Sequence, residues 1–154
     1  MNSPFANLFI AISDQVLAEV PEIKWIDMDL GQLEAFDGDR PPVEWPCLLI
    51  DFTNTDFAQM QGYQDGNMDI ILRLAFDEYE STSAETPTLV RQSALEYFEI
   101  EQKLYEALQR WKAGGLLTNA MKRTNAATEK RENDNFRVRR ISFAATFSDG
   151  SVTG

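Results

Sequence analysis

Carboxylates are the only plentiful side chains in this sequence that could carry out chemistry. The 154 residues include 25 aspartates and glutamates, one cysteine and no histidine. Histidine is the commonest general base near neutral pH and the commonest metal ligand, so its absence removes His-dependent catalysis and most transition-metal sites. One cysteine cannot build a zinc site, and neither GxxxxGK[ST] nor GxGxxG occurs in the chain. A reactive or metal-binding site would therefore have to be built from acidic groups.

Two closely spaced acidic pairs could hold a hard cation. Asp27 and Asp29 are two residues apart, which places both carboxylates on one face of a strand. Asp37 and Asp39 flank Gly38, a pattern typical of a turn. A calcium loop needs several further ligands after the glycine, and the sequence lacks them. We interpret the first pair as a solvated strand face and the second as a turn, and we predict no metal site and no cofactor.

Three further acids could supply an acid and a base if the fold brought them into one pocket: Glu34, Glu44 and Asp51. Among 25 acids, some will lie close together by chance, so we predict that the protein is not an enzyme. A cleft with two acids of raised pKa would indicate an enzyme that uses carboxylates alone. Cys47 lies in an apolar run, which predicts a buried, unreactive thiol.

The charges are divided unevenly along the chain. The net charge is −11, which argues against nucleic-acid binding through phosphate contacts. Residues 1–110 hold 21 acids and 6 bases, whereas residues 111–154 hold 4 acids and 8 bases. An acidic body and a basic end can attract further copies of the chain or another charged partner, although strands and loops can also simply differ in composition. Within the basic end, we predict a protein-contact patch or a solvated face at Arg137, Arg139 and Arg140.

Two amphipathic helices are predicted, and each begins at a proline preceded by a hydroxyl side chain that can cap it. The first starts at Ser3-Pro4, carries apolar residues at three- and four-residue spacing, and ends at Pro21. The second starts at Thr86-Pro87 and extends over about residues 87–111. Gly114-Gly115 then stops it.

Short apolar runs and alternating patterns predict the strands. We expect strands over residues 23–30 and 47–52, separated by a long loop at 31–45, and a last strand over 136–147. In the last strand the apolar residues change from even to odd positions, so we predict a β-bulge at Arg139-Arg140. The remaining segments are expected to be polar loops at 78–86 and 124–135, a short helix at 116–122 and a loose tail at 148–154.

Asp65-Gly66 predicts the turn of a long β-hairpin with arms over about residues 56–63 and 67–77. This turn would pair Phe57 with Leu74 at the base and place Gln61 opposite Ile70 farther out. A projecting hairpin is unstable with both faces in water, so either the rest of the chain or a neighbouring subunit must cover it. We favour a subunit or partner interface formed by Gln59, Gln61, Tyr63, Met68, Ile70 and Ile71.

The element order predicts an α+β fold: an antiparallel sheet with a long β-hairpin and two amphipathic helices packed on one face. We expect a single domain over residues 1–154. The N-terminus lacks a signal-peptide pattern, and no apolar stretch reaches the roughly 18–20 residues that span a bilayer. We therefore expect a soluble cytoplasmic protein with no membrane partner.

The chain resembles the tail-terminator and head–tail joining proteins of tailed bacteriophages and prophages. The resemblance covers about residues 4–148 and rests on the element order, on the proline before an apolar strand (Trp45-Pro46-Cys47-Leu48-Leu49-Ile50), on "IILRLAFD" before the second helix and on "LTNAMKRTN" after it. It implies a non-enzymatic assembly protein that forms a ring, often hexameric, and binds tail-tube and head-connector proteins. It also implies assembly in the bacterial cytoplasm, a final place in the virion or tail particle, and no nucleic-acid specificity.

A small α+β ligand-binding module is the alternative. A fold of this size can hold a small molecule between helix and sheet. Its mark would be a closed apolar cavity lined by Trp25, Phe52, Phe76, Phe98 and Phe143.

Overall fold

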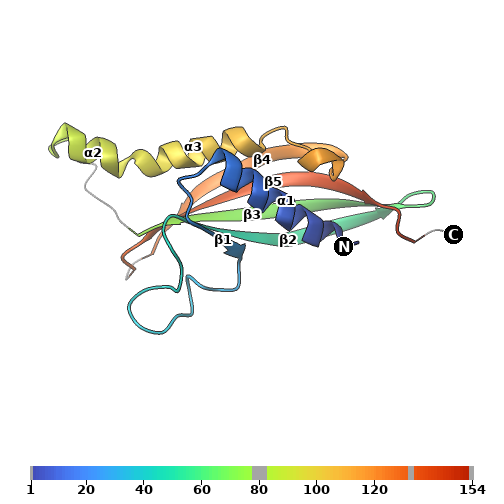
Figure 1. Ribbon diagram of the computed structural model, residues 1–154, viewed down its shortest axis with the longest axis horizontal. Helices are drawn as coiled ribbons and strands as arrows, with labels where there is room; N and C mark the ends of the chain where they lie inside the picture. Colours follow the sequence, from blue (N-terminus) through green and yellow to red (C-terminus); the bar gives the residue numbers. More distant parts are fainter. Residues whose placement is uncertain (1, 78–82, 132–133, 153–154) are drawn as a thin grey trace.

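The computed structural model describes residues 2–77, 83–131 and 134–152, which form a five-stranded mixed sheet with helices on one face (Figure 1). The strand order is β1-β2-β3-β5-β4; β1 is parallel to β2, and the other three pairings are antiparallel. The α+β class is therefore confirmed, with one parallel pairing in addition. The elements are α1 (Pro4–Glu19), β1 (Trp25–Met28), β2 (Cys47–Gln59), β3 (Gln64–Phe76), α2 (Thr88–Ala94), α3 (Glu96–Leu108), the 3-10 turn η1 (Ala113–Gly115), β4 (Asn119–Glu129) and β5 (Arg137–Asp149).

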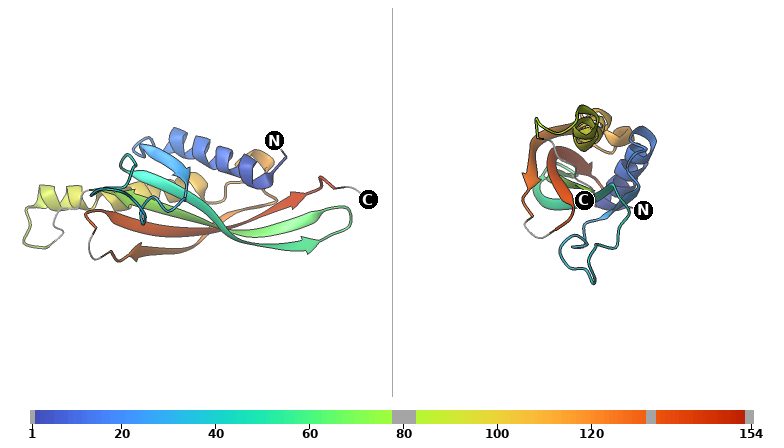
Figure 2. Two further views of the ribbon diagram at one scale, coloured as in Figure 1. Left: turned by 90° about the horizontal axis from the view of Figure 1, so that it is seen from below. Right: turned by 90° about the vertical axis from the view of Figure 1, so that its left-hand side faces the viewer.

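The first helix forms as predicted. The Ser3 side chain accepts a 3.4 Å hydrogen bond from the Ala6 N–H, and Pro4 occupies the first helical turn. Its buried stripe, Leu8, Ile12 and Val16, lies on the sheet beside α3 (Figure 2). No helix within the described ranges is both long and apolar enough to cross a membrane.

The predicted second helix is divided in two at Leu95, where the backbone has φ −92° and ψ −4°. Only α3 packs along the sheet, with Ile100, Leu104 and Leu108 buried. The shorter α2 buries Ala94 alone and extends past the end of the sheet (Figure 1). The polar loop predicted at 78–86 lies partly outside the described residues, at 78–82.

The predicted hairpin turn is wrong. The chain turns at residues 60–63, where the Met60 N–H donates to the Tyr63 carbonyl at 2.8 Å and Gly62 has φ +85°. Gly66 instead lies inside β3 opposite Phe57, and a Cβ on it would stand 2.4 Å from Cζ of Phe147. The close contact with the Phe147 ring requires a glycine at position 66. The glycine of the Asp65-Gly66 pair therefore serves this contact and not a turn.

The new turn changes the whole register of the hairpin. β2 is one continuous strand that includes both the predicted buried strand and the first arm, with one irregularity between Phe52 and Asn54. Phe57 therefore does not pair with Leu74, whose partner is Leu48.

The segment after α3 is also different from the prediction. β4 occupies most of the stretch assigned to a short helix and a polar loop, and it pairs along β5 with irregularities at Asn119/Lys122 and Arg123/Asn125. Pairing with β5 overrides the weak strand propensity of its small polar residues. β5 itself extends to Asp149, farther than predicted, and pairs with β3 without a register shift, so the bulge at Arg139-Arg140 is not formed.

The change of phase in β5 has another cause, because the sheet has a core on each face. The apolar residues at odd-numbered positions of β5 face the helices, whereas Phe136 and Val138 face a second, smaller core. The loop at 31–45 supplies Leu33, Phe36 and Val43 to this second core. The prediction assumed that all the apolar residues of this strand face one side.

Candidate functional site

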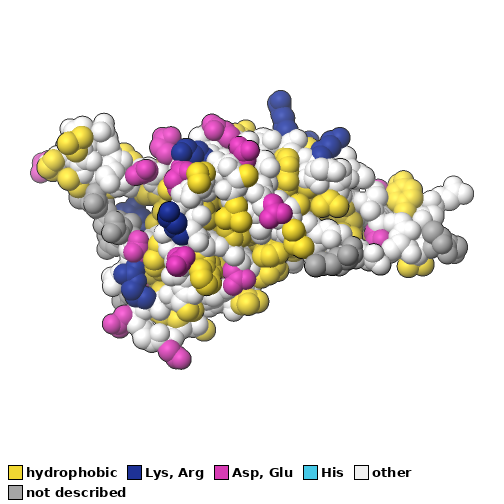
Figure 3. Space-filling model, in the orientation of Figure 1, with side chains coloured by type: hydrophobic (Ala, Val, Ile, Leu, Met, Phe, Trp, Pro, Cys, Tyr) yellow, Lys and Arg dark blue, Asp and Glu magenta, His cyan; other side chains and the backbone are white. Residues whose placement is uncertain are grey.

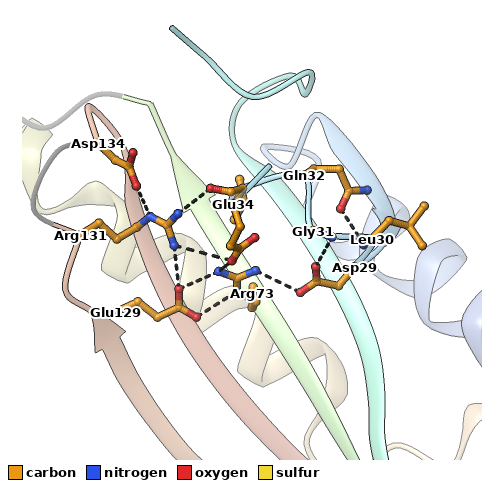
Figure 4. Close-up of polar contacts among 10 residues, drawn as sticks. Asp29, Leu30, Gly31, Gln32, Glu34, Arg73, Glu129, Arg131 and Asp134 are labelled. Atoms are coloured by element: carbon orange, nitrogen blue, oxygen red, sulfur yellow. Dashed lines mark hydrogen bonds and ion pairs between the residues drawn. The ribbon is translucent and has the colours of Figure 1, made fainter. Parts of the chain in front are cut away.

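A cluster of charges around a buried arginine lies on the sheet face that the loop at 31–45 covers (Figure 4). Arg73 of β3 is at its centre and only 8% exposed. Its guanidinium contacts Glu129 through two hydrogen bonds, from Nε at 2.9 Å and from Nη2 at 2.8 Å. It also donates to Asp29 at 3.2 Å and to Glu34. One arginine therefore joins the ends of β1 and β4 and the loop.

A second arginine extends the cluster. Arg131 donates to Asp134 at 2.6 Å, to Glu129 at 3.3 Å and to the Leu33 carbonyl at 2.5 Å. Its guanidinium also lies 4.8 Å from the centre of the Phe136 ring. Leu33 is fully buried, so this contact helps to hold the covering loop in place.

Electrostatics favour the charged state of the central arginine. Burial alone would lower the pKa of Arg73, but the hydrogen bonds that Arg73 donates to Glu129 and Glu34 outweigh burial and raise the pKa above its ordinary value. A buried ion pair is weak evidence of net stability, but loss of one partner leaves the other charges uncompensated. The cluster is therefore suited to fixing the loop on the sheet.

Some of the acids considered for chemistry accept hydrogen bonds within the fold, and the others lie apart from one another. Asp29 and Glu34 accept from Arg73, and Asp27 accepts from the Met28 N–H at 2.8 Å. Glu44 is exposed in the loop, and Asp51 lies on β2 opposite Ile71. Within the described residues, no group of three or more potential ligands is placed to hold a metal ion. The side chain of Cys47 is buried, and burial raises the pKa of its thiol to about 12, as expected of an unreactive thiol.

The six residues predicted for an interface separate into two groups. Met68, Ile70 and Ile71 are buried in their own chain, with exposures of 2%, 0% and 6%. Their placement on the surface was wrong because the turn was placed at Asp65-Gly66. Gln59, Gln61 and Tyr63 are exposed at the hairpin end, and they are joined there by two residues that the sequence analysis missed, Phe57 and Met60, at 53% and 42% exposure. A turn at Gly62 would have identified both. We call Phe57, Gln59, Met60, Gln61 and Tyr63 the hairpin tip.

The three arginines predicted as one contact patch do not lie together. Arg137 donates to the Tyr97 hydroxyl at 2.9 Å, and Arg139 donates to Glu101 at 2.5 Å, so both face the helices. The hydrogen bond that Arg139 donates to Glu101 raises the pKa of Arg139. Arg140 is exposed on the opposite face, because neighbouring residues of a strand point to opposite sides. Glu101, the polar interruption in the predicted helix stripe, is the partner of Arg139.

A different group of bases is exposed at the turn after α3. Arg110, Lys112 and Lys122 are all exposed, and none of them forms an ion pair with a described residue. Figure 3 shows Lys and Arg side chains at this upper edge of the molecule. The opposite edge, along the outer half of β2, carries Asp51 and Asp56, which also form no ion pair within the described part of the chain.

Apolar side chains are exposed at both ends of the long axis (Figure 3). At one end is the hairpin tip, and at the other α2 exposes Leu89 at 81% and Val90 at 40%.

A pocket of ≈ 230 Å³ lies beside the start of α3, lined by Pro46, Phe76, Asp77, Ser93, Ala94, Glu96, Tyr97 and Ile100.

That pocket is not the cavity expected of a ligand-binding module. Of the five predicted lining residues only Phe76 contributes to it. Phe143 is fully buried in the larger core, Phe98 is 40% exposed, and Trp25 packs on the other face of the sheet.

Comparison with known proteins adds one finding about the fold. No protein-family model and no curated protein matches the chain. Among solved structures, the chain is similar to a component of the virion of a native gene transfer agent particle. The TM-score is 0.53 at 14% sequence identity, and the match covers 96% of this chain and 99% of the other. At this identity the likeness shows a shared fold.

Proposed function

We propose that this chain is a non-enzymatic structural protein of a phage-like particle and that it assembles as a ring, a hexamer in the simplest case, at the tail end or the head–tail junction. The observation that carries the proposal is the similarity of fold to a virion component. The match covers nearly the whole of both chains. It agrees with the resemblance of the sequence to tail-terminator and head–tail joining proteins.

The distribution of charge supports a structural role. The acids that could have served catalysis, Asp29 and Glu34, neutralise an arginine that holds a loop. The other notable features lie on the surface. They are the exposed apolar side chains at the two ends of the molecule and the charged side chains along the edges of the sheet. Surfaces of this kind suit contacts with other proteins.

The hairpin tip is proposed as the surface that contacts the next component of the particle, a tail-tube or head-connector protein. It exposes two aromatic rings and a methionine among glutamines, residue types that are common at protein interfaces. Its place at one end of the long axis leaves the sides of the molecule available to further copies (Figure 1).

Solution mass tests the assembly directly. Light scattering at low and high protein concentration, with negative-stain images of the same samples, should show a closed ring of uniform diameter. The variant Met60→Glu/Tyr63→Glu should form the same ring, because the hairpin tip is reserved for another component. A monomer at every concentration would contradict the ring, and loss of the ring in the tip variant would contradict the assignment of the tip.

A further inference from the structure

The two side edges of the sheet are different in chemistry. On one side, β1 pairs only with residues 47–50 of β2, so the outer edge from Asp51 to Gln59 has no backbone partner among the described residues. Asp51 and Asp56 lie along this free edge. We call this stretch the acidic edge; it offers carboxylates as hydrogen-bond acceptors, and its backbone presents unpaired carbonyls and N–H groups.

On the other side, the chain after α3 covers the first half of β4. The Met121 N–H donates to the Trp111 carbonyl at 3.0 Å, and the Met121 carbonyl accepts from the Arg110 N–H at 2.9 Å. These two bonds bring the backbones of Arg110, Lys112 and Lys122 together at this edge, where the Lys122 side chain lies on the open sheet face that also carries Asp56. We call these three residues the basic edge. Lysine and arginine side chains only donate hydrogen bonds and carboxylates only accept them, so the side chains of the two edges are complementary in charge and in hydrogen bonding.

The two edges lie at the same level along the strands. Across the sheet, Lys122 pairs with Ala144, Ala144 with Asp69, and Asp69 with Asn54. By the same route Asn119 is level with Asp56, through Thr146 and Asn67. Lys122 is therefore level with Asn54, which lies between Asp51 and Asp56 on β2.

We propose that the acidic edge of one copy binds the basic edge of the next, in a head-to-tail contact between copies of this chain. The proposal rests on the ring described above and names the surfaces that form it. Two different surfaces that fit each other generate a ring if the rotation closes and a helical filament if it does not. Because the two edges are level, neighbouring copies need no shift along the strands, and the geometry favours a closed ring.

Charge reversal with mixing tests the pairing. Asp51→Lys/Asp56→Lys gives a copy with bases on both edges, and Lys112→Glu/Lys122→Glu gives a copy with acids on both. Each variant alone should lose assembly and run as a monomer by light scattering. An equimolar mixture should assemble again, with the two variants alternating, because each then meets an opposite charge at both edges. Asp14→Lys/Glu19→Lys makes the same charge change on exposed positions of α1 and should assemble like the parent chain.

The outcomes separate the interface from the ring. Circular dichroism and urea unfolding should show that every variant is folded, since all substituted side chains are at least partly exposed. If the parent forms rings and the reversed variants do so equally, the pairing of these edges is overturned and the ring stands. If folded variants fail alone and also fail when mixed, the edges do not contact each other. If the parent stays monomeric at all concentrations and low salt, the ring itself is overturned.

Discussion

The two halves of the sheet show opposite ways of using charge. In the half that contains Arg73, both faces are covered, by α3 and by the loop at 31–45, and the central charges, Arg73 and Arg139, form ion pairs. In the half that ends at the hairpin, α1 covers one face, and the other exposes Asn54, Asp56, Asn67 and Asp69 to solvent. Its charges have no ion-pair partner within the described residues. The difference indicates that the covered half holds the fold together and the open half is available for contacts.

The largest effect should come from placing a charge in the core under the hairpin. Ile70→Glu puts a carboxylate at a position with 0% exposure and should cost about 5 kcal/mol of unfolding free energy or more. Met60→Glu, in the exposed hairpin tip, should change the free energy of unfolding by less than about 0.5 kcal/mol. Urea unfolding measures both. A similar loss in both variants would show that the hairpin tip also belongs to the folded core.

Removal of the central arginine should have the next largest effect. Arg73→Met removes the cation that Glu129, Glu34 and Asp29 share, leaving Arg131 beside the first two and Asp29 with no other ion-pair partner among the described residues, and should cost about 3–5 kcal/mol. Arg140→Met, directly opposite on β5 but exposed, is the matched control and should be close to neutral. Chemical denaturation gives both values. A loss below about 1 kcal/mol in Arg73→Met would mean that the cluster does not hold the loop.

A smaller effect is expected at the glycine inside the hairpin. In Gly66→Ala the new methyl would meet the Phe147 ring, with Cζ at 2.4 Å, and should cost about 1–3 kcal/mol. Gly150→Ala, whose nearest contact would be 3.9 Å, should be nearly neutral. The double variant Gly66→Ala/Phe147→Leu should recover part of the loss in thermal unfolding. No recovery would show that strand pairing, and not the ring contact, requires the glycine.

The smallest effect depends on pH and lies in the covered half. The pKa of Cys47 is about 12 in the folded protein against 9.0 unfolded, so the folded state keeps its proton while the unfolded state loses it. The stabilisation is complete below pH 9 and is lost as the pH rises toward 12. At pH 10 the parent should have lost about 1.4 kcal/mol relative to its value at pH 8, a loss that Cys47→Ala should not show. Parallel pH profiles of the two proteins would contradict this burial of the thiol.

Local signals in the sequence were sufficient for part of the fold. The Ser3-Pro4 start, the stripe of α1 and the buried run at Cys47 all describe single elements, and the structure confirms them. The α+β class followed from the order of such elements. These predictions depend only on residues close together in sequence, so the amino-acid sequence alone was enough to make them.

The errors concern contacts between residues far apart in sequence. Gly66 was assigned to a turn because its reason for being glycine, the Phe147 ring, is 81 residues away. β4 was missed because β5 supplies its pairing, and the bulge was predicted because the second core under Leu33 was unknown. The site was affected as well: the three arginines were grouped by position in the chain, whereas Arg137 and Arg139 bind Tyr97 and Glu101 of α3, and Arg140 lies on the other face of the sheet.

The separation of the hairpin tip and α2 along the long axis gives any ring built about the strand direction two unlike rims (Figures 1 and 2). All copies would point the same way, so one rim would present a circle of Phe57, Met60 and Tyr63, and the other a circle of Leu89 and Val90. Such a ring has polarity. It can join two different neighbours in a fixed order, and it cannot be inserted upside down without exchanging the chemistry of its two sides.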